Sequence, residues 1–170
     1  IFGNPHYWLD PLNGKVIARN IANGLERIDP SNKSFYENNL QSFFNNINIK
    51  MKQWQAAMAP FNGSKIIAYH NEWVYFETRF GLKIVDFMEP KPGIPPTPSQ
   101  LVKVIGEIKP NNIKVIISSP YFSTSSSDVV AKQTGVKVLV MATSVGAFPS
   151  IKNYFDVFDY DINQLSAALK

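Results

Sequence analysis

The chain has 170 residues, of which 45% are hydrophobic, 13% aromatic and 18% charged. This balance supports a sizeable hydrophobic core and excludes an intrinsically disordered chain. The absence of cysteine excludes disulfides, thiolate-based zinc and iron–sulfur sites, and a thiol nucleophile. Seventeen Lys and Arg against 13 Asp and Glu give a net charge of +4, and the basic residues are scattered, so we expect no nucleic-acid partner.

The sequence begins with Ile1 and has no basic stretch followed by an apolar one. We therefore expect no signal peptide within these residues. No apolar run approaches the roughly 18–20 residues that a membrane-spanning helix needs.

A first helix is predicted over residues 11–28. Asp10 offers a capping side chain, and Pro11 suits the first helical turn. Ile17, Ile21 and Leu25 then follow at helical spacing.

A second, long helix is predicted over residues 31–59. Asp29-Pro30 repeats the start signal, and apolar residues then recur in steps of three and four until Pro60 ends the pattern. At about 1.5 Å per residue this helix would be about 40 Å long, so it is predicted to be a strut with a solvent-facing side.

The rest of the chain alternates β-rich runs with short amphipathic stretches, which is typical of βαβ units. The fold class is therefore α/β, with a parallel sheet flanked by helices. The predicted strands are 65–69, 83–88, 113–118 and 137–141. The predicted helices are 73–80, 99–108, 127–134 and 163–169.

Polar residues follow each predicted strand, at the sheet edge where ligands bind in parallel α/β folds. They are His70, Glu89, Ser118-Ser119 and Ala142-Thr143-Ser144. A lone histidine at a strand end is more often structural than a ligand. The only other histidine, His6, lies between two prolines, in a rigid segment suited to presenting a ligand at a fixed angle.

Catalytic motifs are absent from the sequence. It contains no His-Glu-x-x-His, Gly-x-Ser-x-Gly, phosphate-binding loop or dinucleotide-binding glycine pattern. His70 and Glu72 are two residues apart, a spacing that would place them on different faces of a helix. We expect the protein not to be an enzyme, with a metal-dependent hydrolase as the minor alternative.

Several motifs, in order along the whole chain, resemble one known family. They are Asn4-Pro5-His6-Tyr7-Trp8-Leu9-Asp10-Pro11, the long helix opened by Asp29-Pro30-Ser31-Asn32, the strand ending in His70, Phe76-x-x-Arg79-Phe80-Gly81-Leu82, and Thr134-Gly135-x-Lys137-Val138. This set is similar to the zinc/manganese solute-binding proteins of ABC transporters, the ZnuA/TroA-like family, in a divergent branch.

The resemblance implies part of a two-lobed receptor. Residues 1–29 would be the end of the amino-terminal lobe, residues 30–59 the long linking helix, and residues 60–170 the carboxyl-terminal α/β lobe. A divalent transition metal, Zn²⁺ first and Mn²⁺ as the alternative, would be bound by His6 and His70. The family's carboxylate loop, usually Asp-Pro-Leu, is replaced here by Ala142-Thr143-Ser144, which leaves Glu89 or water as the fourth ligand.

The resemblance also implies a bacterial, extracytoplasmic protein, periplasmic or anchored at the cell surface, that delivers its metal to an ABC permease. A metal-independent surface interaction or adhesion function is the alternative. Because the apolar stripe of the first helix lacks a partner in this chain, we also expect a homodimer or a swapped assembly.

Overall fold

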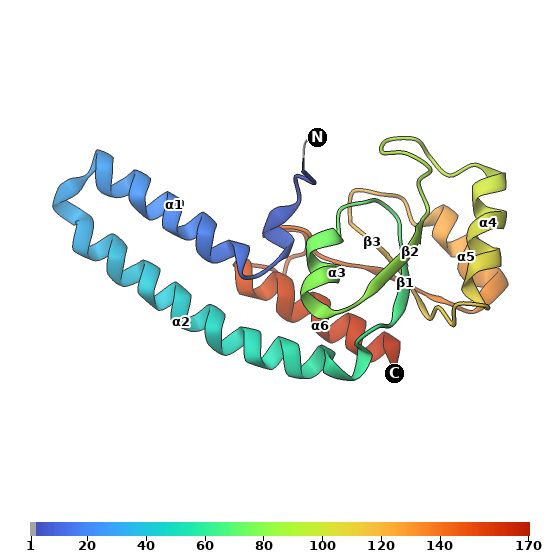
Figure 1. Cartoon of the computed structure of the whole chain (residues 1–170). Coiled ribbons are helices and arrows are strands. Elements are labelled where there is room, and N and C mark those ends of the chain that lie inside the picture. The colour runs from blue at the N-terminus through green and yellow to red at the C-terminus, as the bar shows by residue number, and fades with distance from the viewer. Residues whose placement is uncertain (1–2) are drawn as a thin grey trace.

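The computed structural model describes residues 3–170 as a parallel α/β unit from which a long pair of helices projects (Figure 1). All strands of its sheet run parallel, in the order β2-β1-β3-β4. The strands are β1 (Lys65–Ala68), β2 (Lys83–Phe87), β3 (Val115–Ser118) and β4 (Lys137–Val140). The predicted fold class and all four predicted strands are confirmed, although β1, β2 and β4 each end one residue earlier than predicted and β3 begins two residues later.

Helices cover both faces of the sheet (Figure 1). One face packs on α4 (Pro98–Ile108) and α5 (Ser125–Thr134), and the other on α2 (Lys33–Met58), α3 (Val74–Phe80) and α6 (Tyr154–Leu169). Successive strand residues point to opposite faces, so Ile67 joins the first core while Ile66 and Ala68 join the second. Because both faces of the sheet are buried, the central strands are continuous runs of apolar residues in the sequence.

The projecting pair consists of α1 (Asn13–Ile28) and α2, which has 26 residues. A short 3-10 turn, Pro30–Asn32, joins them. The Asp29 carboxylate accepts hydrogen bonds from Ser31, Asn32 and Tyr36, which lower its pKa to about 2. Both predicted helices are thus confirmed, and the side chain of Asp29 stabilises the turn between them.

The last helix is longer than predicted, because α6 begins at Tyr154 and not near residue 163. Asn153 and Asp156 form a capping box at its start. The acidic side chains that obscured the helical pattern have their own partners: Asp159 accepts hydrogen bonds from Trp54 and Lys50 of α2. The prediction for this segment was wrong because these tertiary contacts cannot be read from local periodicity.

The segment that carries His6 is docked on the carboxyl edge of the sheet. It contains a 3-10 turn, Tyr7–Leu9, and α1 starts at Asn13, later than the predicted residue 11. Asp10 accepts the N–H of Leu12 at 2.9 Å, as a helix-start residue does, but it also binds the Arg79 guanidinium through two hydrogen bonds of 2.7 Å. The capping role predicted for Asp10 is therefore only part of its function.

Three further hydrogen bonds join this segment to distant parts of the chain. The Trp8 indole donates to the Thr143 carbonyl oxygen at 2.8 Å, and the Tyr154 hydroxyl donates to the Trp8 carbonyl oxygen at 2.6 Å. The Asn4 amide donates to the carbonyl oxygen of Asn71, next to His70, at 2.8 Å. The backbone around His6 is thus fixed relative to the loops at the ends of β1 and β4.

None of the helices in residues 3–170 combines the length and apolarity that crossing a bilayer requires.

The contact between α1 and α6 leads to a first prediction. A Cβ at Gly14 would lie 2.5 Å from Cε1 of Tyr154, so Gly14→Ala must displace the ring that holds the Trp8 carbonyl. We expect a loss of about 1–3 kcal/mol in the free energy of unfolding, as for other overpacked sites. Urea denaturation would measure it. Gly24→Ala is the matched control, because nothing lies within 4 Å of its added Cβ. The control should gain about 0.5–1 kcal/mol from helix propensity, and equal effects of the two changes would contradict the prediction.

Candidate metal centre

The candidate site lies where the strand order changes direction. The chain passes from β1 to β2 on one side, whereas β3 lies on the other side of β1. Loops that leave β1 and β3 therefore diverge, and the space between them is the usual ligand-binding position in an open parallel sheet. His70 follows β1 here, and Ser118-Ser119 ends β3.

His70 is held by Glu89. The hydrogen-bond ladder continues past β1 and β2, with the N–H of Glu89 donating to the Tyr69 carbonyl oxygen at 3.0 Å. This pairing brings Nδ1 of His70 to 2.6 Å from Oε2 of Glu89, a side chain that is only 5% exposed. Phe122 packs against the imidazole at 5.4 Å between ring centroids. Nε2 is thereby the ring nitrogen left to face a ligand.

His6 is held in a similar way by Asn4. Nδ1 of His6 lies 2.8 Å from Oδ1 of Asn4, which also accepts the backbone N–H of His6 at 3.0 Å. Burial and the nearby His70 lower the pKa of His6 below its usual value of 6.5. At neutral pH, His6 is thus a neutral imidazole, and the lone pair of its Nε2 atom can bind a ligand.

The two imidazoles are neighbours. Their ring centroids are 5.8 Å apart and their planes are nearly perpendicular, and the Trp8 ring lies 5.5 Å from His6. The sequence prediction brought together two residues that are 64 positions apart, and the structure places them side by side. An oxygen acceptor on Nδ1 with Nε2 left open is the arrangement that orients metal-binding histidines.

Two buried carboxyl groups lie at the same edge of the sheet, on the turn after His70 and beside the loop that follows β4. Glu72 is 4% exposed and Asp161 is fully buried. Burial raises the pKa of Glu72, and burial raises the pKa of Asp161 well above its usual value. One oxygen of each carboxyl group lacks a hydrogen-bond partner, as do the hydroxyls of Ser118, Ser119 and Thr143. Unpaired polar atoms are thus concentrated at this edge.

Sequence reasoning did not assign these two acids to the site. The spacing of two residues between His70 and Glu72 was interpreted as placing them on different faces of a helix. Both residues lie instead in a tight turn, in which the Glu72 N–H donates to the His70 carbonyl oxygen at 2.9 Å. Asp161 lies on the stretch of α6 that the predicted last helix left out. The sequence did contain one signal, because the loop after β4 lacks the carboxylate that the family resemblance implies there. In the structure, the N–H of Ala142 in that loop donates to the carboxylate of Asp161 at 2.6 Å.

The remaining predicted positions have structural contacts. The carbonyl oxygen of Thr143 accepts the Trp8 indole, and the Ser144 hydroxyl lies 3.2 Å from that of Tyr121. Within residues 3–170, no three side chains of His, Asp or Glu come together closely enough to hold a metal ion. The structure therefore supplies an imidazole pair with acidic groups around it, and not a complete ligand cage.

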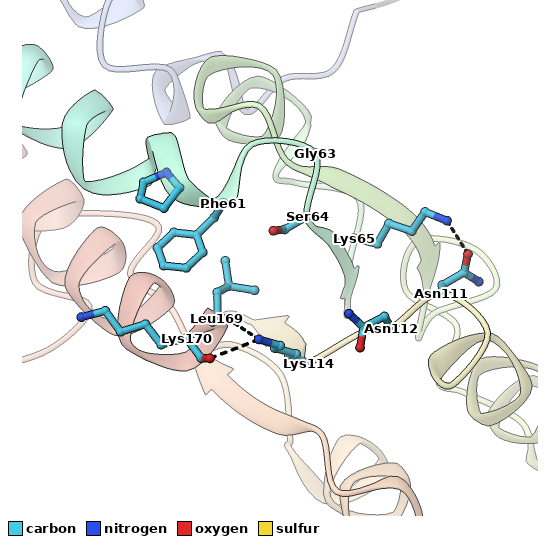
Figure 2. Close-up of a pocket in the computed structure, with 10 residues that line it drawn as sticks. Phe61, Gly63, Ser64, Lys65, Asn111, Asn112, Lys114, Leu169 and Lys170 are labelled. Atoms are coloured by element: carbon cyan, nitrogen blue, oxygen red, sulfur yellow. Dashed lines mark hydrogen bonds between the residues drawn. The ribbon is translucent and has the colours of Figure 1, made fainter.

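A separate hollow of about 440 Å³ lies at the opposite edge of the sheet (Figure 2). Lys65 and Lys114 project into it from the starts of β1 and β3, and their amines donate to the Asn111 side chain and to the Leu169 carbonyl oxygen. None of its ten lining residues carries a carboxylate or imidazole side chain. This hollow therefore offers no metal-binding chemistry that could rival the histidine pair.

The parallel sheet and the imidazoles at its switch point define an α/β protein with a candidate ligand-binding site. Comparison with known proteins makes this specific. The chain belongs to the ZnuA family, zinc-uptake complex component A, periplasmic, whose match covers residues 3–168. The family is one of solute-binding proteins, so the predicted family and the expectation of a non-enzyme are both confirmed.

Individual relatives agree with the family match. The high-affinity zinc uptake system protein ZnuA of Brucella abortus (strain 2308) is 28% identical over 165 residues, which are 97% of this chain and 48% of that protein. A crystal structure of ZnuA has a TM-score of 0.87 at 26% identity, covering 99% of this chain and 63% of that one. The chain thus spans about half the length of the curated relative it matches.

A further similar structure is the laminin-binding protein Lmb of Streptococcus agalactiae, described as a bifunctional protein with adhesin and metal transporting activity. It has a TM-score of 0.86 at 26% identity and covers 98% of this chain and 65% of its own. Proteins with this fold therefore include one with a second, adhesive activity.

The His70–Glu89 contact leads to a second prediction. Because Glu89 accepts from Nδ1, neutral His70 should be the Nδ1–H tautomer. A two-bond ¹H–¹⁵N correlation spectrum at about pH 8 would show it. Glu89→Ala removes the acceptor, and the Nε2–H tautomer should then gain population, whereas Asn71→Ala, an exposed neighbour, should leave the spectrum of His70 unchanged. A parent spectrum dominated by the Nε2–H form would contradict the assignment.

Proposed function

We propose that this protein is an extracytoplasmic solute-binding protein that captures a divalent transition metal and delivers it to an ABC permease. The observation that carries the proposal is the pair of adjacent imidazoles, each with Nδ1 held by an oxygen and Nε2 open. His6 and His70 are the proposed ligands. The family match, with its zinc-uptake description, supports this function independently of the geometry.

Zinc is the proposed metal and manganese the alternative. Imidazole nitrogen suits zinc, whereas manganese favours sites richer in oxygen. Both histidines are only partly exposed, and the aromatic rings of Trp8 and Phe122 lie against them. Such an apolar wall limits water access and strengthens the attraction between the ion and its ligands.

The proposed division of the chain follows from this function. Residues 1–29 form the end of one lobe, residues 30–59 the linking helix and residues 60–170 the second lobe. The strong contacts of α2 with α6 and of α1 with α2 support a rigid connection, because the helix that leaves one unit is packed on the other. The proposed location is the periplasm or the bacterial cell surface.

Zinc titration tests the ligand assignment. The chain should bind one Zn²⁺, and His6→Ala or His70→Ala should each weaken binding by more than about 100-fold, since even outer partners of metal ligands contribute about 10–100-fold. Competition with a chromophoric chelator would measure the dissociation constants. Asn71→Ala is the control, because its exposed side chain adjoins His70 without touching the imidazole.

Two results would count against metal capture. One is zinc binding by the double variant His6→Ala, His70→Ala that equals that of the parent. The other is specific binding to laminin that persists in excess chelator while no zinc is bound, which would support the adhesion alternative that the resemblance to Lmb raises.

We further propose that the 170-residue chain self-associates through an apolar groove between α1 and α2. Ile21 and Phe35 line this groove and are 57% and 61% exposed. Two copies that pair by these faces would remove both side chains from water in a symmetric contact. The long, antiparallel helices offer a continuous surface for such a pairing (Figure 1).

Sedimentation analysis of charge variants tests the self-association. Phe35→Glu places a carboxylate in the groove and should convert a dimer into a monomer, because an unpaired charge cannot be buried at such an interface. Ile49→Glu is the matched control: Ile49 is also 57% exposed on α2 but does not line the groove. A monomeric parent at high concentration would refute the proposal.

A further inference from the structure

A lysine stands at the start of every strand of the sheet. Lys65, Lys83 and Lys137 are the first residues of β1, β2 and β4, and Lys114 directly precedes β3. Because the strands are parallel, their starts share one edge, the amino edge, opposite the edge that carries the histidines. Neighbouring strands are about 4.8 Å apart, so these exposed lysines form a row about 15 Å long.

Three further exposed lysines lie where helices end at the same edge. Lys109 follows α4, Lys132 lies in the last turn of α5, and Lys170 follows α6. The end of α6 belongs to this edge because its Leu169 carbonyl oxygen accepts from the Lys114 amine. Basic residues that are scattered along the sequence are thus brought together by the topology, and seven of the 17 Lys and Arg residues share the amino edge.

None of these seven lysines forms an ion pair within residues 3–170. The Lys and Arg residues that do form ion pairs there are Arg19, Lys33, Lys50, Arg79 and Lys103. The Lys65 amine donates to the Asn111 side chain and the Lys114 amine to the Leu169 carbonyl oxygen (Figure 2). These acceptors are neutral, so they orient the lysines without cancelling their charge.

Two acids lie on the helices next to the amino edge, and both accept from amides. Oε1 of Glu77 accepts the Ile84 N–H at 2.6 Å, and Oε2 of Glu107 accepts the side-chain amide of Asn111 at 2.7 Å. The carboxyl ends of the helices add partial negative charge at this edge. Seven lysines exceed these contributions, so the amino edge has a net positive charge.

A structural role explains only some of the lysines. A cation near the carboxyl end of a helix is stabilised by the helix dipole, which accounts for Lys109 and Lys132. It does not account for Lys65 and Lys83, which are register partners on neighbouring strands. Like charges at paired positions repel and lower stability. A row that folding alone disfavours is typical of a surface with a function.

The chemistry of this row fits the phosphates of a lipid bilayer better than a nucleic acid. All seven cations are lysines, and none is the planar guanidinium that reads bases through paired hydrogen bonds. A bilayer presents its phosphates in a plane, which several lysines along one edge can meet together. The hollow of about 440 Å³ between Lys65 and Lys114 is lined by Ser64, Asn111 and Asn112 among others, which offer further hydrogen bonds to a phosphate (Figure 2).

We propose that the amino edge of the sheet is a docking surface for an anionic phospholipid bilayer. The row of lysines meets the phosphate layer, and the hollow beside Lys65 and Lys114 takes one headgroup. Docking at this edge is independent of metal capture, because His6 and His70 lie at the opposite edge. A protein seated on the bilayer in this way turns its histidines away from the membrane.

Vesicle flotation tests the proposal on the 170-residue chain. At low salt the chain should float with vesicles of phosphatidylglycerol and phosphatidylcholine in equal parts, and not with phosphatidylcholine alone. Each lysine near an anionic bilayer strengthens binding about five-fold. The triple variant Lys65→Gln, Lys83→Gln, Lys137→Gln should therefore bind about 100-fold more weakly, and added salt should weaken binding of the parent because it screens the charges.

A second triple variant is the matched control for net charge. Arg27→Gln, Lys91→Gln, Lys152→Gln removes the same charge from exposed side chains that lie on α1, after β2 and before α6. It should weaken vesicle binding by less than about five-fold, since none of these residues belongs to the amino edge. Equal losses in the two triple variants would overturn the proposal, because binding would then depend on net charge alone.

Three other results would also overturn it. The first is a parent that binds both kinds of vesicle equally or neither. The second is binding to duplex DNA in the absence of vesicle binding, which would assign the row to a nucleic acid. The third is release from vesicles by inorganic phosphate at constant ionic strength, which would indicate a site for the free ion. Circular dichroism checks folding, and Lys65→Arg, Lys83→Arg, Lys137→Arg keeps the charge and should bind like the parent.

Discussion

The histidine pair depends on the attachment of residues 4–10 to the carboxyl edge of the sheet. The Asp10–Arg79 pair fixes this segment to α3, and the Tyr154 hydroxyl fixes it to α6. His6 has no element of its own to hold it, because it precedes the first helix. Its 5.8 Å distance from the His70 ring is therefore set by hydrogen bonds to the α/β unit. The arrangement of the two imidazoles therefore depends on this docking more than on either loop.

The same edge concentrates groups that a folded protein normally pairs. Buried polar atoms without partners are rare in native proteins, and each one costs stability. Here Glu72, Asp161 and three hydroxyls meet at the point where parallel strands end. These unpaired atoms lower the local stability of the edge where a ligand is expected to bind. The core on both faces of the sheet, in contrast, is apolar. This division of roles between core and edge is common in α/β proteins.

Periodicity predicted the fold because both sheet faces are buried and the long helices carry regular apolar stripes. It failed at α6, where Asp156, Asp159 and Asp161 interrupt the stripe in order to reach a cap, α2 and the β4 loop. His6 and His70 could be selected from residue type and strand position together with the family resemblance. Glu72 could not, because its approach to His70 results from one tight turn rather than from any helical or strand repeat.

The hydrogen bonds around Trp8 connect residues that are far apart along the chain. Its indole reaches Thr143, 135 positions later, and its carbonyl oxygen reaches Tyr154, 146 positions later. Contacts of such separation carry a large loop-closure entropy and make folding slower. A chain still emerging from the ribosome has His6 and His70 long before it has the residues that hold them together. The two imidazoles are thus held side by side only once residues near the carboxyl end of the chain have folded against the segment that carries His6.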